Sequence, residues 1–451
     1  MRVIDFPNEL VLSDGTRVNN SRELAELIVE GSAVSREVLE LLYNGHLASW
    51  LKRTGCNAMA DKAEQLRVSG SEPDELLRQL RRVLHVLTIE ADGESLEKAI
   101  LKAQPGDTLL LVSGVYRLSV PLEIRKSLSL GGQGEVETRI VGSGKGSVLI
   151  LEGDCRWKIS DIGLEHEGDA QADVVVVTDG EIMMQRCSCV GGIGDKEYTT
   201  GTGLSMKGRS RGTIAKCEFF RNGASGIRIT DEAQITLEDN ICKDNRQAGI
   251  EYLFRSGGVS RNNQCSSNGN MGIRVAGEAD PLLEGNICQE NRGVGIMYAG
   301  VASGTALDNQ CIRNGNSGIR MTEKARPTLE GNICRYNRGA GIAYIAGTFG
   351  TARNNQCIGN ENAGIQVAGE AKPVLESNIC RDNRETGIGY FATSGGIARH
   401  NQCIGNEGFG IQVLSEADLL LEKNICRDNK EMGILAGRTT IVNGGNGLGR
   451  S

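Results

Sequence analysis

The chain has 451 residues, too many for one small core, so two domains or one long repeat body are expected. With 50 Lys and Arg against 57 Asp and Glu, its net charge of −7 gives no electrostatic case for binding nucleic acid or an anionic membrane. The 61 glycines, 7 prolines and 4% aromatic residues favour many tight turns over an ordinary enzyme core.

The start, MRVIDFPNELVLSDG, lacks a basic segment followed by an apolar stretch, and no apolar run approaches the ~20 residues of a membrane span. The 14 cysteines do not indicate a secreted disulfide scaffold, because such scaffolds are short and exported. We therefore expect a cytoplasmic protein that contacts no membrane and no nucleic acid.

Residues 1–85 predict a small helical, adaptor-like domain that begins with a β-hairpin. The stretch VIDFPNELVLSDGTRV alternates polar and apolar residues around Asp14-Gly15, as a hairpin does. The stretches SRELAELIV, SREVLELLYNGHLASWLKRTG, NAMADKAEQLR and EPDELLRQLRRVL have the apolar spacing of amphipathic helices. We expect Trp50 to pack in the core of this domain; an exposed partner contact at Trp50 is the alternative.

From about residue 88 the sequence changes to a short helix, a Pro-Gly turn and then strands of three to five residues separated by Gly, Asn and Asp. Beyond residue 200 it repeats every 23 residues, so that Asn378-Ile379-Cys380 returns as Asn401-Gln402-Cys403. A fixed period of this length predicts a solenoid, in which each unit buries its apolar side against its neighbours. Three short strands and three turns fill one coil, and equivalent residues then stack about 4.8 Å apart.

The stretch GNICRDNRETGIGY and its relatives resemble the N-x-x-x-x-N-x-x-x-G-I repeat of right-handed parallel β-helices of the pectate-lyase-like superfamily, which includes carbohydrate-binding and sugar-hydrolase repeat proteins. The stretch ADGESLEKAILKAQPGDTLLLVSGVY resembles their N-terminal capping helix and first strand. The resemblance covers residues 88–436 and implies an all-β solenoid. It does not choose among lyases, hydrolases, epimerases, tailspikes and binding modules.

The repeating Cys, Asn and Gly residues each have a structural reason. A buried free Cys behaves as a small hydrophobe, and without C-x-x-C pairs or His partners we expect neither a metal nor another cofactor. Asn side chains can bond equivalent amides one coil above, and Gly suits a turn with positive φ or close backbone approach. The nine regularly spaced thiols are Cys242, Cys265, Cys288, Cys311, Cys334, Cys357, Cys380, Cys403 and Cys426.

A second period of 46 residues is superimposed on the first. Tyrosine occupies every second coil at one position, and strand alternation points it inward, although an exposed sugar-stacking platform is the alternative. These candidate binding residues are Tyr252, Tyr298, Tyr344 and Tyr390. Acid and base also alternate in one column, as in Glu238, Arg261 and Glu284, which predicts a device that fixes the register of a solvated face.

Sugar-cleaving β-helices gather carboxylates on adjacent coils. The regular coils show no such cluster, so we predict no glycosidic-bond cleavage there. The irregular coils of residues 150–200 contain many acids, and among them Asp169 and Asp173 are the catalytic or Ca²⁺-binding candidates; solvated turns are the alternative.

We favour a non-enzymatic scaffold that presents the β-helix face to a protein partner, an arrangement similar to F-box proteins that carry a β-helix. The alternative is a carbohydrate-active lyase, epimerase or hydrolase, for which carbohydrate is the partner. The Gly-rich tail, residues 437–451, has no amphipathic helix to cover the last coil, so we also expect a homodimer or a complex through that end.

Overall fold

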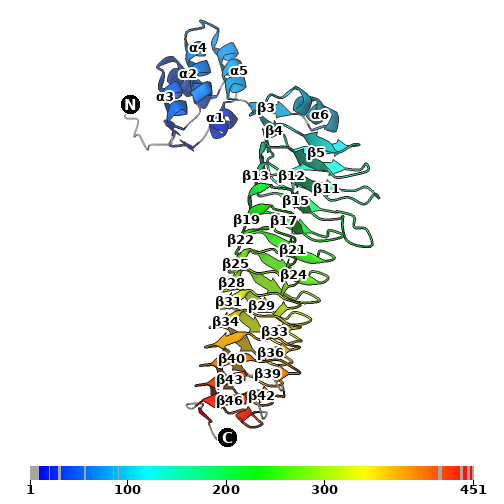
Figure 1. Cartoon of the computed structure of the whole chain (residues 1–451). Helices are drawn as coiled ribbons and strands as arrows, with labels where there is room; N and C mark the ends of the chain where they lie inside the picture. Colours follow the sequence, from blue (N-terminus) through cyan, green and yellow to red (C-terminus); the bar gives the residue numbers. More distant parts are fainter. Residues whose placement is uncertain are drawn as a thin grey trace. The chain divides into compact units, whose positions relative to one another are not determined.

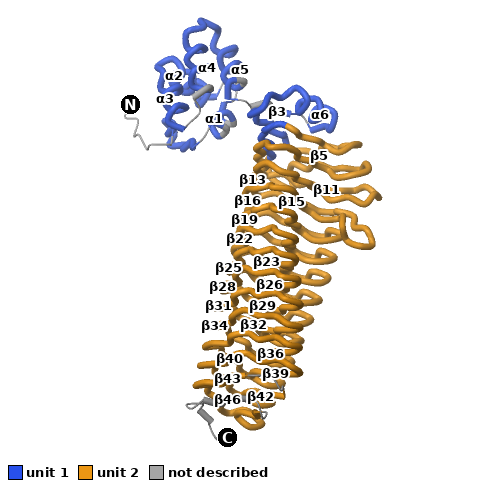
Figure 2. The backbone as a smooth tube through the Cα atoms, in the orientation of Figure 1, with its two compact units in different colours: residues 1–112, 126–132 blue, residues 113–125, 133–451 orange. Residues whose placement is uncertain are grey.

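The computed structural model describes residues 10–19, 21–28, 32–54, 57–84, 86–89, 91–414, 419–436, 440–443 and 447–448. The chain divides into two compact units (Figure 2). Unit 1 comprises residues 1–112 and 126–132, and unit 2 comprises residues 113–125 and 133–451. In the described residues, no helix is both long enough and apolar enough to cross a membrane.

Unit 1 begins with the expected hairpin, in which β1 (Leu10–Val11) pairs antiparallel with β2 (Arg17–Val18). The expected helices follow as α1 (Ser21–Leu27), α2 (Ala33–Tyr43), α3 (His46–Arg53), α4 (Asn57–Arg67) and α5 (Pro73–Val83). Ser32 caps α2 by accepting a hydrogen bond from the Ser35 amide, as an N-cap serine does. Trp50 is completely buried among the leucines of this unit, so an exposed partner contact at Trp50 is excluded.

The rest of unit 1 is a parallel group of strands with one helix. The strands β3 (Val86–Ile89), β4 (Thr108–Leu111) and β7 (Leu128–Gly131) pair in that order, and α6 (Gly93–Lys102) lies between β3 and β4 in the chain. Asp92 caps α6 through the amide of Ser95.

Unit 2 is a parallel β-helix whose three sheets run along its length (Figure 1). In unit 2, sheet B contains β10 (Arg156–Ser160), β13 (Glu181–Gln185), β16 (Arg211–Ala215), β19 (Gln234–Glu238), β22 (Gly257–Arg261), β25 (Leu282–Glu284), β28 (Thr305–Leu307), β31 (Thr328–Glu330), β34 (Thr351–Arg353), β37 (Val374–Glu376), β40 (Gly396–Arg399), β43 (Leu419–Glu422) and β46 (Thr440–Asn443).

Sheet C follows sheet B within each coil. It contains β5 (Gly114–Leu118), β8 (Thr138–Gly142), β11 (Gly163–His166), β14 (Ser188–Val190), β17 (Glu218–Phe220), β20 (Ile241–Lys243), β23 (Gln264–Ser266), β26 (Ile287–Gln289), β29 (Gln310–Ile312), β32 (Ile333–Arg335), β35 (Gln356–Ile358), β38 (Ile379–Arg381), β41 (Gln402–Ile404), β44 (Ile425–Arg427) and β47 (Gly447–Leu448).

Sheet D completes each coil. It contains β6 (Leu122–Ile124), β9 (Leu149–Glu152), β12 (Val175–Thr178), β15 (Leu204–Lys207), β18 (Ile227–Ile229), β21 (Ala248–Tyr252), β24 (Met271–Val275), β27 (Ile296–Tyr298), β30 (Ile319–Met321), β33 (Ile342–Ile345), β36 (Ile365–Ala368), β39 (Ile388–Phe391), β42 (Ile411–Val413) and β45 (Ile434–Leu435).

The 23-residue register predicted from the cysteines is confirmed, because Cys242 pairs with Cys265, and Cys265 with Cys288, on neighbouring strands. All nine of these thiols are free and completely buried. Burial raises the pKa of the Cys242, Cys288 and Cys311 thiols well above the ordinary thiol value. The four tyrosines of the 46-residue period, Tyr252, Tyr298, Tyr344 and Tyr390, are likewise fully buried, which excludes the exposed sugar-stacking platform.

Two stacks of asparagine run through the turns on either side of sheet C. In one of them, the amide N–H of Asn314 donates to Oδ1 of Asn337 over 3.0 Å, and Nδ2 of Asn314 donates to the carbonyl of Cys288 over 3.0 Å. The other stack repeats this arrangement, as at Asn332 and Asn355. Each asparagine therefore satisfies turn groups that the strand ladders do not reach.

The β-helix continues beyond residue 436 into the segment expected to be a tail. There β46 pairs in parallel with β43, and β47 pairs with β44. The remaining residues of that segment, and with them the expected contact between two copies, lie outside the described residues.

Candidate functional site

In the coils between residues 179 and 392, one residue at each turn that leads from sheet D to sheet B has a left-handed backbone with positive φ and belongs to a single column. Most of these residues are small or acidic, which suits a conformation that disfavours bulky side chains. The column consists of Asp179, Gly208, Asp231, Phe254, Gly277, Gly300, Glu323, Ala346, Gly369 and Ala392.

Phe254 is the exception in this column. Its φ is 58°, and its side chain is 63% exposed to solvent. A left-handed conformation costs a non-glycine residue about 1–2 kcal/mol, and an exposed ring recovers little of that cost through packing. The fold explains the positive φ of this column but not the choice of an exposed phenylalanine at residue 254, which makes Phe254 a candidate functional residue.

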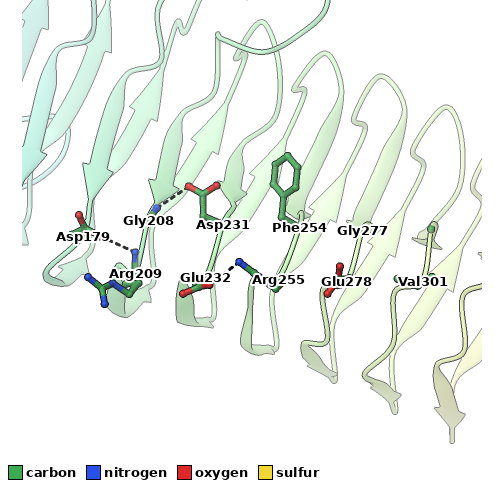
Figure 3. Close-up of a pocket in the computed structure, with 11 residues that line it drawn as sticks. Asp179, Gly208, Arg209, Asp231, Glu232, Phe254, Arg255, Gly277, Glu278 and Val301 are labelled. Atoms are coloured by element: carbon green, nitrogen blue, oxygen red, sulfur yellow. Dashed lines mark hydrogen bonds and ion pairs between the residues drawn. The ribbon is translucent and has the colours of Figure 1, made fainter.

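Phe254 stands in a groove of 690 Å³ that runs along this edge of unit 2 (Figure 3). The groove is lined by Asp179, Gly208, Arg209, Asp231, Glu232, Phe254, Arg255, Gly277, Glu278, Gly300 and Val301. A second groove of 600 Å³ shares Asp179 and Arg209 with it and extends over Asp154, Arg156, Glu181 and Arg211.

The carboxylates of the Phe254 groove are held in defined positions (Figure 3). Asp179 Oδ1 accepts the amide of Arg209, and Asp231 Oδ2 accepts the amide of Gly208, both over 2.9 Å. Glu232 Oε1 accepts a hydrogen bond of 2.8 Å from Nη2 of Arg255. With four carboxylates and two guanidinium groups in its lining, the groove favours ligands without negative charge.

The coils that follow Phe254 leave room beside its ring. The next two residues of the column are Gly277 and Gly300, which place no side chain on the groove floor. A Cβ on Gly277 would lie 2.9 Å from the backbone nitrogen of Phe254, so a larger residue would crowd the turn. The exposed ring of Phe254, followed by glycine at the next two positions of its column, offers a surface on which a flat apolar face can stack.

The outward face of sheet D next to this groove carries a buried ion cluster. Arg228 Nε lies 2.8 Å from Glu251 Oε2, and Arg274 lies 3.3 Å from the same carboxylate. Arg228 also donates to the carbonyls of Tyr198 and Thr199, which lie in the long connection between β14 and β15. The cluster thus fixes this connection against sheet D.

The two acids predicted as catalytic candidates do not lie in the Phe254 groove. Asp173 is buried and accepts the amide of Thr202 over 2.7 Å, and burial raises its pKa. Asp169 is exposed in a turn. Neither Asp169 nor Asp173 lines the Phe254 groove or the second groove, and Asp173 serves to anchor the long connection.

Other acids of residues 150–200 form surface ion pairs: Arg186 with Asp161, Arg139 with Glu165, and Arg117 with Glu167. From residues 150–200, the acids that line the two grooves are Asp154, Asp179 and Glu181. The acid and base column on sheet B forms the predicted pairs, including Arg261 with both Glu238 and Glu284 and Arg399 with Glu376.

Sequence reasoning missed Phe254, although the signal was present. Aligned at the 23-residue period, Phe254 occupies a column of Asp, Gly, Glu and Ala. Within the part of the chain that the structure describes, no group of three or more His, Cys, Asp or Glu side chains is arranged to hold a metal ion.

The model of the right handed beta helix region matches residues 131–280, 252–372 and 363–446, so the chain belongs to this family. No curated protein matches the sequence. The chain is similar in fold to a double mutant of the periplasmic alginate epimerase AlgG, with a TM-score of 0.51 and 14% identity over 78% of this chain and 85% of that one.

Two further solved structures are similar at lower scores. The A-module of the Azotobacter vinelandii mannuronan C-5 epimerase AlgE4 has a TM-score of 0.47 and 18% identity over 78% of this chain and 96% of that one. A catalytic domain of a GH87 alpha-1,3-glucanase has a TM-score of 0.47 and 10% identity over 80% of this chain and 68% of that one.

These results correct the preference for a non-enzymatic protein-binding scaffold. The AlgG structure, whose TM-score of 0.51 with this chain shows a common fold, is an epimerase. The prediction of no glycosidic-bond cleavage rested on a repeat with no local departure, whereas Phe254 and the cluster around Glu251 are such departures.

Proposed function

We propose that the protein is a carbohydrate-active enzyme that binds a polysaccharide without acidic groups in the Phe254 groove. Phe254 is the observation that carries this proposal, because an exposed ring in a strained turn needs a ligand to explain it. The apolar face of a sugar ring stacks on Phe254 above Gly277, while the surrounding carboxylates and arginines bind its hydroxyl groups.

The charge of the groove favours hydrolysis over elimination or epimerisation. The last two reactions remove a proton next to a uronate carboxylate, and a site for them needs positive charge at that carboxylate. Here carboxylates outnumber guanidinium groups four to two. Neutral sugars therefore suit this groove better than uronates.

Two glutamates in one column supply the acid and the base. Glu232, held by Arg255, acts as the base, and Glu278, exposed on the far side of Phe254, acts as the acid. They lie two coils apart, which is about 9.6 Å between backbones and falls near the upper end of the carboxylate separation of inverting hydrolases.

Incubation with a panel of neutral polysaccharides, followed by a reducing-end assay, tests this proposal. We expect Glu232→Gln and Glu278→Gln to abolish release of reducing ends and Phe254→Ala to raise KM. The control is Glu323→Gln, which removes a carboxylate from the column of Phe254 outside the groove and should leave activity unchanged. Failure to bind or cleave any neutral polysaccharide, or unsaturated products from a uronate polymer, would contradict the proposal.

A further inference from the structure

A second exposed aromatic residue in a strained turn lies at the other edge of sheet D, in the turn that follows β32. Tyr336 has a φ of 57° and is 54% exposed. A Cβ on Gly359, the equivalent residue one coil later, would lie 2.7 Å from Cε1 of Tyr336. The tyrosine ring therefore lies over Gly359, and its other face is open to solvent.

Exposed arginines surround this ring. Arg335 and Arg338 flank Tyr336 in the same coil, and Arg313 occupies the Tyr336 position one coil earlier. Among the residues that the structure describes, none forms an ion pair with Arg313, Arg335 or Arg338. Tyr336 is thus bordered by three guanidinium groups that are free to bind an anion.

The next 46-residue period shows that the fold does not require this arrangement. The residues equivalent to Arg335, Tyr336 and Arg338 are Arg381, Asp382 and Arg384. There Arg381 pairs with Asp382 at 4.0 Å, and Arg384 pairs with Glu361 at 3.7 Å. The arginines of the later period, Arg381 and Arg384, are thus paired with carboxylates. Arg335 and Arg338, at the equivalent positions beside Tyr336, are not.

Two carboxylates lie near the arginines and were considered as partners. Glu361 follows Arg338 in its column but is paired with Arg384. Glu290 precedes Arg313 in the column of left-handed turn residues and is exposed. Glu290 lies two coils from Tyr336 and, among the residues that the structure describes, forms no ion pair with Arg313. The platform formed by Arg313, Arg335, Tyr336 and Arg338 therefore remains positively charged.

We propose that this Tyr336 platform binds an anionic sugar residue of a uronic-acid-containing glycan. The ring of the sugar stacks on Tyr336, and its carboxylate accepts hydrogen bonds from the neighbouring guanidinium groups. The platform lies four coils beyond Phe254 and at the opposite edge of sheet D, so it is a separate site that does not depend on the proposed hydrolysis.

Single-stranded nucleic acid is the other polymer that aromatic and arginine side chains bind. Such surfaces stack successive bases on several aromatic residues along a positively charged groove. Here one tyrosine stands alone over Gly359, so there is no row of aromatic side chains for successive bases. This favours a single stacked acidic sugar.

The experiment is calorimetric titration of the full chain with a galacturonate oligosaccharide, with the corresponding neutral oligosaccharide and with single-stranded DNA. We expect the uronate alone to depend on the platform, with about tenfold weaker binding in Tyr336→Ala and in Arg335→Gln/Arg338→Gln. Arg381→Gln/Arg384→Gln, which makes the same change at the ion-paired period, and Phe254→Ala should leave uronate affinity unchanged.

Three results would overturn the proposal. One is the absence of uronate binding at millimolar concentration, and another is an equal loss of affinity in the Arg381→Gln/Arg384→Gln control, which would indicate nonspecific charge attraction. The third is binding of single-stranded DNA that is tighter than that of the uronate and is lost in the Tyr336→Ala variant.

Discussion

The Cβ atom that Gly318 lacks would lie 2.8 Å from the Cβ of Cys334, in the next coil. The same position would lie 2.7 Å from the carbonyl oxygen of Gly341. The glycine before each isoleucine and the cysteine of the following coil therefore fill one space together. This relationship recurs along the β-helix, as at Gly249 and Cys265 and at Gly387 and Cys403.

Gly318→Ala should lower the free energy of unfolding by about 1–3 kcal/mol, because the added methyl group overpacks a site with backbone on one side. Cys334→Ala removes the sulfur and should restore part of that loss in the double variant. Urea unfolding of the two single variants and the double variant measures the coupling. If the change in unfolding free energy of the double variant equals the sum of the changes in the two single variants, the two residues do not share the space.

Phe254→Gly should raise the stability of the protein while it removes ligand binding. Glycine adopts the left-handed turn without the cost of about 1–2 kcal/mol that phenylalanine bears, and the exposed ring contributes little packing. Thermal melting should therefore show an unchanged or higher Tm for Phe254→Gly. A clear fall in Tm would mean that the ring stabilises the fold, and the argument for a ligand would lose its basis.

Asp173→Asn should keep the fold and the activity. The asparagine carbonyl can still accept the amide of Thr202, and the buried site no longer has to hold a charge. Burial raises the pKa of Asp173 in the native state, so the native protein binds more protons than the unfolded chain between the ordinary carboxyl pKa and the raised one.

The contribution of Asp173 to the free energy of unfolding is therefore greatest at low pH. It falls as the pH rises from the ordinary carboxyl pKa through the raised pKa of Asp173. Asp173→Asn should flatten this part of the curve of unfolding free energy against pH and give an equal or more stable protein at neutral pH. Loss of activity in Asp173→Asn, with the fold intact, would instead support the catalytic role that the sequence first suggested for Asp173.

Arg228→Gln should loosen the connection between β14 and β15. It removes the donor to the carbonyls of Tyr198 and Thr199 and one partner of the buried Glu251, a change that costs about 3 kcal/mol when a buried pair is broken. Limited proteolysis should then cut near Tyr198. Arg274→Gln is the control, because Arg274 is more exposed and leaves Arg228 on Glu251; equal cleavage in both variants would refute the role of Arg228.

The fold of unit 2 could be predicted from the sequence because its ladders are local and periodic. Cysteines equivalent to Cys265 and asparagines equivalent to Asn314 recur at 23-residue intervals. Each cysteine pairs with the equivalent cysteine of the next strand, and each asparagine is hydrogen-bonded to the equivalent asparagine one coil away. The 23-residue period was enough to predict the stacked coils of the β-helix, and strand alternation was enough to predict that Tyr252 points inward.

The candidate site could not be predicted in the same way, since it consists of exceptions to the repeat. The search for acids found Asp173, whose carboxylate turned out to be an anchor for Thr202, and gave no weight to an aromatic residue in a turn. The 23-residue alignment shows Phe254 as an exception in its column, but the significance of Phe254 and Tyr336 depends on the backbone conformation and the exposure of their side chains. The ion pair between Glu232 and Arg255 also could not be predicted without the geometry of the turn.

The most direct measurement is a crystal structure of the protein soaked with the neutral oligosaccharide that it binds best. We predict electron density for a sugar ring stacked on Phe254 above Gly277, with its hydroxyl groups within hydrogen-bond distance of Glu232 or Glu278. An oligosaccharide bound at saturating concentration anywhere else on the molecule, with the Phe254 groove empty, would contradict the proposed function.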